Sequence, residues 1–140
     1  MRLSIALAAV AAIISATPAS AGFVNNRPIW NALSDQQKSG FVMAVIDNMM
    51  IADITSPYAT ADSRAILACF NENSLTDGDL IELVDKGYED PATWTSPAFG
   101  ILYSAVLTKV CPYYVNRERT IDGLEYKVGP DAKPWVAPSE

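Results

Sequence analysis

Apolar residues recur at helical spacing in four stretches of the chain, within residues 34–51, 60–73, 76–88 and 97–111. Positions three and four residues apart share one face of a helix, so this recurrence predicts four helices that each bury one face. The pattern therefore favours a small all-α domain of four helices. The expected buried positions are Phe41, Val42, Val45, Ile46, Met49, Ile66, Leu67, Cys69, Phe70, Leu80, Leu83, Val84, Tyr88, Phe99, Leu102, Tyr103, Val106 and Val110.

Polar residues mark the starts of two of these helices. Ser34 is followed three residues later by Gln37, the spacing of a capping box, in which each side chain binds the other residue's backbone N–H. Thr76 is expected to cap the third helix. Asp77 and Asp79 would then lie in its first turn, where carboxylates complement the positive end of the helix dipole.

Two Ser-Pro pairs are expected to separate helices. A residue before proline disfavours the helical conformation, so Ser56-Pro57 predicts a break, with the second helix starting at Thr60 or Asp62. Ser96-Pro97 is expected to cap the fourth helix, because proline suits the first helical position, where no N–H is needed.

The pattern changes beyond the fourth helix. Asp122-Gly123 lies between two short alternating segments, residues 115–121 and 124–128, which is typical of a β-hairpin. An irregular loop is the alternative, because an isolated hairpin is only marginally stable. We therefore expect residues 113–140 to form a C-terminal extension that is irregular or contains a hairpin and is partly disordered.

Residues 1–21 have the composition of a secretory signal peptide. Arg2 supplies a positive start, residues 5–14 are apolar, and Ala19-Ser20-Ala21 fits a cleavage site after Ala21. The apolar stretch is shorter than the roughly 18 residues of a membrane span, so no membrane insertion is expected. The sequence thus predicts a periplasmic protein whose helical domain occupies residues 22–112.

The chain has two cysteines, which permit one intramolecular pair, Cys69 with Cys111. Export into an oxidising compartment favours a structural disulfide there. The alternative is a free, reactive or intermolecular thiol. A CxxC motif is absent from the sequence, so it gives no support to a role in thiol exchange.

Charge and composition narrow the function. Ten basic and 16 acidic residues give a net charge of −6, without the basic stripe that a nucleic-acid-binding protein needs. The chain has no histidine, which excludes Ser-His-Asp and Cys-His catalysis and histidine metal sites. We expect neither a cofactor nor a metal.

Asp77, Asp79 and Glu82 could in principle divide acid and base work as paired carboxylates. Asp77-Gly78-Asp79 also hints at a calcium loop, but the further ligands of such a loop are missing. Stabilisation of a helix start explains the cluster better, so no catalytic residue is predicted.

Several motifs resemble those of the Rap/Tai immunity proteins, small exported helical proteins that protect bacteria from peptidoglycan amidases delivered by type VI secretion. The resemblance spans about residues 34–112. It rests on a cysteine, a threonine-capped helix, a proline a few residues beyond that helix, and a later helix that ends in cysteine. The residues that carry it are Ala68, Cys69, Phe70, Leu75, Thr76, Leu80, Val84, Tyr88, Pro91 and the segment 107–112.

The resemblance implies a homodimer that binds a cognate amidase and occludes its active-site groove with a loop between helices. The matching loop here is residues 89–95, in which the acidic Glu89 and Asp90 suit a basic rim. Trp94 of this loop either closes the end of the bundle, which we favour for its ring, or contacts the partner. The expected partner-binding residues are thus Glu89, Asp90 and Trp94, and the expected function is inhibition by binding, not catalysis.

Two other functions stay open. Acid-stress chaperones of the HdeA kind are also small, periplasmic, helical and held by one disulfide, and carboxylates could act as a pH switch. Their first cysteine lies near the start of the mature chain beside a tryptophan, whereas Trp30 here has no neighbouring cysteine. A carboxylate-dependent hydrolase is the least supported alternative.

Overall fold

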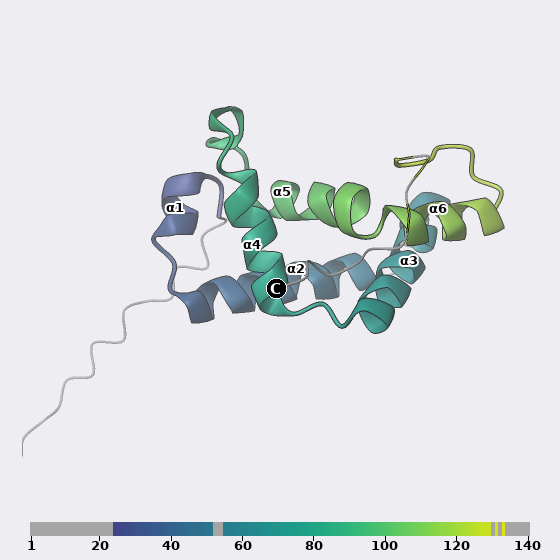
Figure 1. Ribbon diagram of the computed structural model, residues 1–140, viewed down its shortest axis with the longest axis horizontal. Coiled ribbons are helices and arrows are strands. Elements are labelled where there is room, and N and C mark those ends of the chain that lie inside the picture. Colours follow the sequence, from purple (N-terminus) through teal and green to yellow (C-terminus); the bar gives the residue numbers. More distant parts are fainter. Residues whose placement is uncertain (1–23, 52–54, 130, 132, 134–140) are drawn as a thin grey trace, which may run out of the picture.

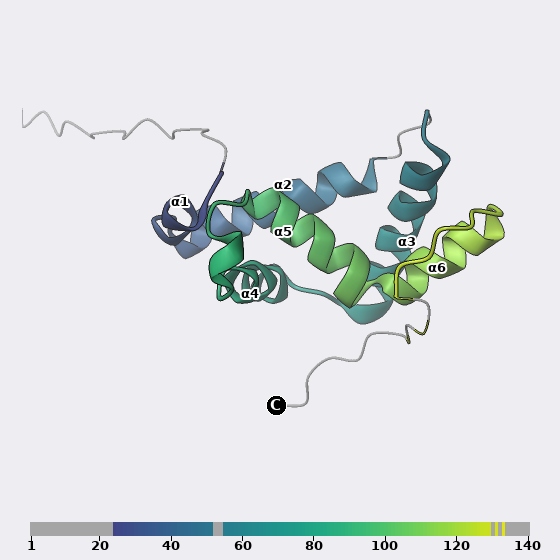
Figure 2. The same cartoon turned by 90° about the horizontal axis from the view of Figure 1, so that it is seen from above.

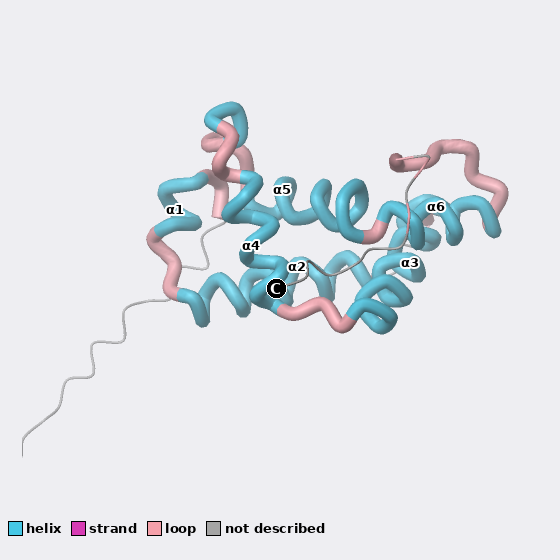
Figure 3. The backbone as a smooth tube through the Cα atoms, in the orientation of Figure 1, coloured by secondary structure: helices cyan, strands magenta, loops and turns pink. Residues whose placement is uncertain are grey.

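The computed structural model describes residues 24–51, 55–129, 131 and 133, so the expected leader and most of the end of the expected C-terminal extension lie outside the described residues. Within them the fold is all-α, as the apolar pattern predicts (Figure 3). The described residues contain no strand, and they form six α-helices where the pattern predicts four. A 3-10 turn (η1) and a π-helical turn (η2) accompany the α-helices. In chain order the elements are α1 (Arg27–Asn31), α2 (Asp35–Met50), α3 (Pro57–Asn73), α4 (Asp77–Gly87), η1 (Pro91–Thr93), α5 (Ala98–Ala105), η2 (Val106–Val110) and α6 (Pro112–Ile121).

Helix α2 lies at the centre of the fold, where it packs against α3, α4 and α5, while α6 packs mainly along α3. Figures 1 and 2 show α1 and α4 at one end of the molecule and α3 and α6 at the other. The segment that joins α4 to α5 projects from the first end (Figure 1). The molecule therefore has two structurally different ends.

The core contains side chains from every helix. Trp30 of the short helix α1 is completely buried and forms a T-shaped pair with the Phe41 ring, with ring centroids 5.8 Å apart. Three predicted core positions are exposed instead: Leu67, Phe99 and Tyr103. Phe99 and Tyr103 are one turn apart on α5 and stack on each other, with centroids 5.7 Å apart. The apolar face of α5 is thus wider than the part of it that the neighbouring helices cover.

The predicted capping box at Ser34 and the predicted cap at Thr76 are both present. Ser34 Oγ accepts a hydrogen bond from the N–H of Gln37 at 3.3 Å, and the Gln37 side chain accepts one from the Ser34 N–H at 2.9 Å. Thr76 and Asp79 bind each other in the same reciprocal way at the start of α4. These bonds satisfy backbone donors that have no partner within the helix.

The Ser56-Pro57 prediction is confirmed in part. Ser56 is extended, as a residue before proline should be, and lies between α2 and α3, so the predicted break is present. Helix α3 begins at Pro57 and not at Thr60 or Asp62, because Ser56 Oγ caps the N–H of Ala59 at 3.3 Å and proline suits the first helical position. The prediction for Ser96 is wrong. Ser96 does not cap α5. That helix begins at Ala98 after Pro97, without a side-chain cap.

The predicted strand at residues 115–121 is wrong, because residues 112–121 form α6. This helix packs on α3 and buries Val115 and Arg119, which lie four residues apart. Because Arg119 is charged, it counts as polar although it is buried, so the sequence does not show the helical spacing of buried residues here. Residues 122–129 are irregular, as the alternative reading predicts. They fold back on α6, where the Asn116 side chain binds the N–H and the carbonyl oxygen of Val128 at 2.8 Å each.

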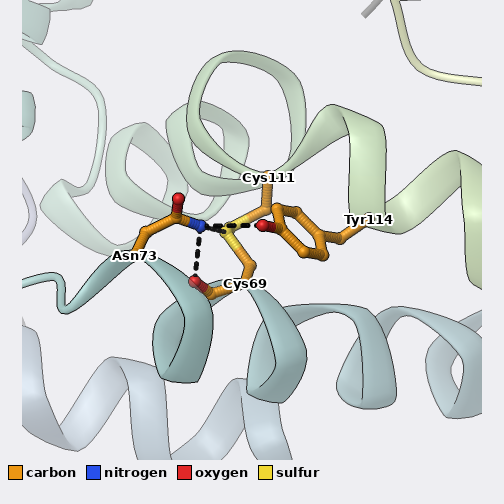
Figure 4. The surroundings of a disulfide bond; sticks show 4 residues. All are labelled: Cys69, Asn73, Cys111 and Tyr114. Atoms are coloured by element: carbon orange, nitrogen blue, oxygen red, sulfur yellow. Dashed lines mark hydrogen bonds between the residues drawn. A yellow bond between two sulfur atoms is a disulfide. The ribbon is translucent and has the colours of Figure 1, made fainter. Parts of the chain in front are cut away.

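The predicted disulfide between Cys69 and Cys111 is confirmed. It joins the last turns of α3 to the junction of η2 and α6, and both cysteines are completely buried. Figure 4 shows Asn73 beside it, where its Nδ2 donates to the Cys69 carbonyl oxygen at 2.7 Å and to Tyr114 Oη at 3.2 Å. The bond connects elements whose cysteines are 42 positions apart.

Among the helices that the structure describes, none is by itself long and apolar enough to cross a membrane. The segments Ala98–Val110 and Pro112–Ile121 meet the length and composition of a span only when taken together, and they are bent by 78° where they meet.

Candidate functional site

The candidate site is the η1 loop, residues 89–95, which contains the expected partner-binding residues. It leaves the end of α4 and returns to α5 after one short turn of 3-10 helix, Pro91–Thr93. Figure 1 shows this segment rising beyond the packed helices.

Hydrogen bonds inside the η1 loop hold its shape. The Asp90 carboxylate accepts the N–H of Ala92 at 2.9 Å and thereby caps the 3-10 turn. The Thr93 hydroxyl is within hydrogen-bond distance of two carbonyl oxygens, that of Gly87 at 2.6 Å and that of Asp90 at 2.8 Å. The backbone N–H of Thr93 also donates to Asp90, at 3.0 Å. The turn is therefore ordered by its own sequence.

Tyr88 closes the base of the loop. Its ring is buried in the core, and its hydroxyl donates to the carbonyl oxygen of Ser96 at 2.7 Å. Burial raises the pKa of the Tyr88 phenol above its ordinary value. In return, Trp94 Nε1 donates to the carbonyl oxygen of Tyr88 at 3.0 Å. The two aromatic residues thus tie both ends of the loop to the helical body.

The Trp94 ring lies at the surface with 44% of the residue exposed, so the expectation of a core ring is wrong. The guanidinium of Arg27 lies over this ring, 4.7 Å from its centroid, and the Arg27 N–H donates to the Trp94 carbonyl oxygen at 3.0 Å. Arg27 was not predicted from the sequence, because it is far from Trp94 along the chain and belongs to a helix without an apolar period. Together they present a flat cation–aromatic surface.

Two hollows flank the η1 loop. One, of about 430 Å³, lies between Trp94 and the start of α1. The other, of about 500 Å³, lies on the side of α4 and α5 and includes Lys86, Asp90 and Lys109. A partner protein could enclose the protruding loop and fill the two depressions beside it.

The charged groups around the loop have both signs. Glu89 and Asp90 are exposed on it. At its foot, Lys86 forms an ion pair with Glu82 at 2.6 Å, which, together with the nearby Glu89, raises the pKa of the lysine. The loop itself contributes only negative charge, which favours a partner surface that carries positive charge.

The acidic cluster of α4 has structural partners. Asp77 accepts a hydrogen bond from Ser39 Oγ at 2.5 Å, which links α4 to α2. The hydrogen bonds of the Thr76 side chain and N–H to Asp79 lower the pKa of that carboxyl below its ordinary value. Across the described part of the chain, no three acidic or cysteine side chains are grouped so that they could hold a metal ion.

Searches against protein-family models, curated proteins and solved structures found no match for this chain. The case for a function therefore depends on the geometry of the loop and on the resemblance described above.

Proposed function

We propose that this protein is an exported inhibitor that binds another protein by inserting the η1 loop into its groove, and that the partner is a peptidoglycan amidase. The observation that carries the proposal is a projecting loop that is fixed by internal hydrogen bonds and exposes part of Trp94. A loop that is already ordered loses little conformational entropy on binding. Tryptophan and arginine are also the residues that most often dominate binding energy.

The charge of the loop supports a groove with a basic rim. Glu89 and Asp90 are exposed beside Trp94, so long-range attraction would speed the encounter while the ring supplies buried area. The choice of an amidase comes from the resemblance to the Rap/Tai family. The homodimer that this resemblance implies is part of the proposal.

Binding to purified peptidoglycan amidases tests the proposal, with the oxidised chain from residue 22 as inhibitor and release of peptide from peptidoglycan as the readout. We expect one amidase to be inhibited stoichiometrically at neutral pH. Trp94→Ala should weaken binding by about 30-fold or more, which is the loss expected for a residue that dominates an interface. Leu67→Ala is the matched control, because Leu67 is an exposed apolar residue on α3, away from the loop.

A second variant tests loop order separately from loop contacts. Tyr88→Phe removes the hydroxyl bond to Ser96 but leaves the exposed surface unchanged, because Tyr88 is buried. We expect weaker binding with an unchanged helical circular-dichroism signal, since the freed loop must be ordered again on binding. Unaltered inhibition by Trp94→Ala would overturn the assignment of the loop. Protection of many unfolded proteins near pH 3, with no amidase bound at neutral pH, would favour the chaperone class.

The implied homodimer has its own measurement. Light scattering after size-exclusion chromatography should give twice the mass of the chain, and a monomer at all concentrations would remove the dimer from the proposal. Amidase binding would still be decided by the inhibition assay.

A further inference from the structure

A second concave site lies at the opposite end of the molecule from the η1 loop. It is a pocket of about 560 Å³ between the start of α3, the segment formed by α5 and η2, and the irregular residues 122–129. Figure 2 shows α3 and α6 at this end, remote from α1 and α4. Its volume lies in the range of small-molecule sites.

An ion pair lies in the wall of this pocket. Arg119 Nε and Nη2 donate to the two carboxylate oxygens of Asp62, both at 2.7 Å, and only 5% of Arg119 and 6% of Asp62 are exposed. A third bond runs from Arg119 Nη1 to the carbonyl oxygen of Tyr126 at 3.2 Å. The two charges neutralise each other, so the pocket offers no free charge. An anion would have to compete with Asp62, which disfavours an ionic ligand.

Three tyrosines form the aromatic part of the pocket. Tyr58 and Tyr126 lie against the guanidinium, 5.2 and 5.3 Å from its central carbon to their ring centroids, and Tyr103 comes from α5. The three are 39%, 63% and 39% exposed, in the order named. Their hydroxyls form no hydrogen bond to any residue that the structure describes. Each phenol can therefore both donate a hydrogen bond to a ligand and accept one from it.

The wall that carries Tyr126 is held in place. Besides the bond from Arg119, the Asn116 side chain binds Val128 through both its N–H and its carbonyl oxygen, and Val128 is buried while lining the pocket. The ion pair and this amide thus fix residues 126–128 against α6. The pocket is a feature of the folded chain and needs no rearrangement to admit a ligand.

We propose that this pocket binds a neutral saccharide. A sugar ring has apolar C–H faces, which pack against aromatic rings, and hydroxyl groups around its edge, which both donate and accept hydrogen bonds. That combination matches tyrosine rings with available hydroxyls better than either alternative does. A purely apolar ligand would remove the phenol hydroxyls from water without replacing those bonds, and a charged ligand meets a site whose charges are already paired.

The proposal is independent of the partner of the η1 loop and is tested with a sugar as the probe. The full chain from residue 22 is titrated with N,N′-diacetylchitobiose and with cellobiose up to about 10 mM, a range in which even millimolar affinity is measurable. Tyrosine chemical shifts or calorimetry report binding. We expect saturable binding of at least one of these sugars, with shifts confined to the pocket.

Variants then assign the site. Tyr103→Ala should weaken saccharide binding by about tenfold, and Tyr103→Phe by less, because it keeps the ring but loses the hydroxyl. Tyr113→Ala is the matched control, since Tyr113 is an exposed tyrosine that does not line the pocket. Thermal unfolding of each variant verifies that it is folded.

Three results would overturn the proposal. These are no binding of either sugar at the highest concentration, binding that Tyr103→Ala leaves unchanged, and tighter binding of a fatty acid or of inorganic phosphate in the same pocket. Saturable sugar binding lost in Tyr103→Ala and kept in Tyr113→Ala would establish it.

Discussion

Arg119 donates two hydrogen bonds of 2.7 Å to the carboxylate of Asp62, although the two residues are 57 positions apart in the sequence. The pair joins α6 to α3 inside the protein, and the third bond of the guanidinium reaches the carbonyl oxygen of Tyr126. A single side chain therefore connects two helices and the segment that follows them. The hydrogen bonds to Asp62 raise the pKa of Arg119, so the guanidinium keeps its charge.

Removing one member of this pair should be costly. We expect Asp62→Asn or Arg119→Met to lower the free energy of unfolding by about 3–5 kcal/mol, because each leaves a buried charged partner uncompensated. The double variant Asp62→Leu, Arg119→Met should recover much of the loss. Urea unfolding measures both, and a double variant as unstable as the sum of the two single changes would show that the two residues act independently.

Reduction of the disulfide should destabilise the fold strongly. Closing a loop across 42 positions restricts the unfolded chain, which the chain-entropy model values at ~4 kcal/mol. Urea unfolding with and without a phosphine reductant should show this difference in midpoint. Equal midpoints, after mass spectrometry has verified reduction, would contradict a stabilising role.

Gly87 lies where α4 packs closely against Ile101 of α5. A methyl group at this position would overlap the Cγ2 methyl of Ile101, which is attached directly to Cβ and has little freedom to move. We expect Gly87→Ala to cost about 1–3 kcal/mol from overpacking, more than the better helix propensity of alanine returns.

Two further variants identify the cause. In an Ile101→Ala background the Gly87→Ala change should be neutral or stabilising, because the overlapping methyl is gone. Gly100→Ala on α5 is the control: nothing lies within 4 Å of an added methyl there, so it should stabilise by up to about 1 kcal/mol. Thermal unfolding of Gly87→Ala, Ile101→Ala, the double variant and Gly100→Ala decides, and a cost of Gly87→Ala that persists in the Ile101→Ala background would refute the steric explanation.

Asp79 should make the free energy of unfolding depend on pH in the acidic range. Its pKa lies below the ordinary value of 3.8, because Thr76 donates hydrogen bonds to the ionised form. A carboxyl with a lowered pKa in the folded state contributes stability above its unfolded pKa, and this is lost as the pH falls through the folded pKa. Asp79→Asn should therefore be less stable than the parent at pH 7 by about 0.5–1 kcal/mol, and the gap should close as the pH falls through the lowered folded-state pKa of Asp79.

Denaturant titrations at several pH values measure that gap. Thr76→Ala supplies the comparison, since it removes the hydroxyl donor and should flatten the same part of the pH profile. A gap between Asp79→Asn and the parent that stays constant from pH 7 to pH 2 would mean that the amide is simply a poorer cap.

Local signals were sufficient to predict much of the fold. Ser34 and Thr76 cap the helices that they were expected to cap, since a capping box depends only on residues three positions apart. Cys69 and Cys111 pair because two cysteines leave one intramolecular choice. Helix caps, which depend on nearby residues, and a disulfide between two cysteines can therefore be predicted without a structure.

The errors arise where distant residues decide the outcome. Residues 115–121 resemble a strand in sequence because Arg119, which is buried through its pairing with Asp62, counts as polar in any pattern. Trp94 lies at the surface beside Arg27, and no residue near Trp94 in the sequence indicates that contact. The sequence points to the loop that contains Trp94 only through a resemblance, because its hydrogen-bonded shape does not follow from residue spacing.

The burial of the disulfide has a kinetic consequence. Neither sulfur-bearing residue is exposed, and the Asn73 side chain binds across the turn of Cys69 to Tyr114, as Figure 4 shows. A reductant in solution can therefore attack only after the ends of α3 and α6 separate, so the rate of reduction is set by how often these helices open. A molecule that stays folded therefore keeps its disulfide during a short exposure to a reductant, whereas a molecule in which these helices have opened is reduced.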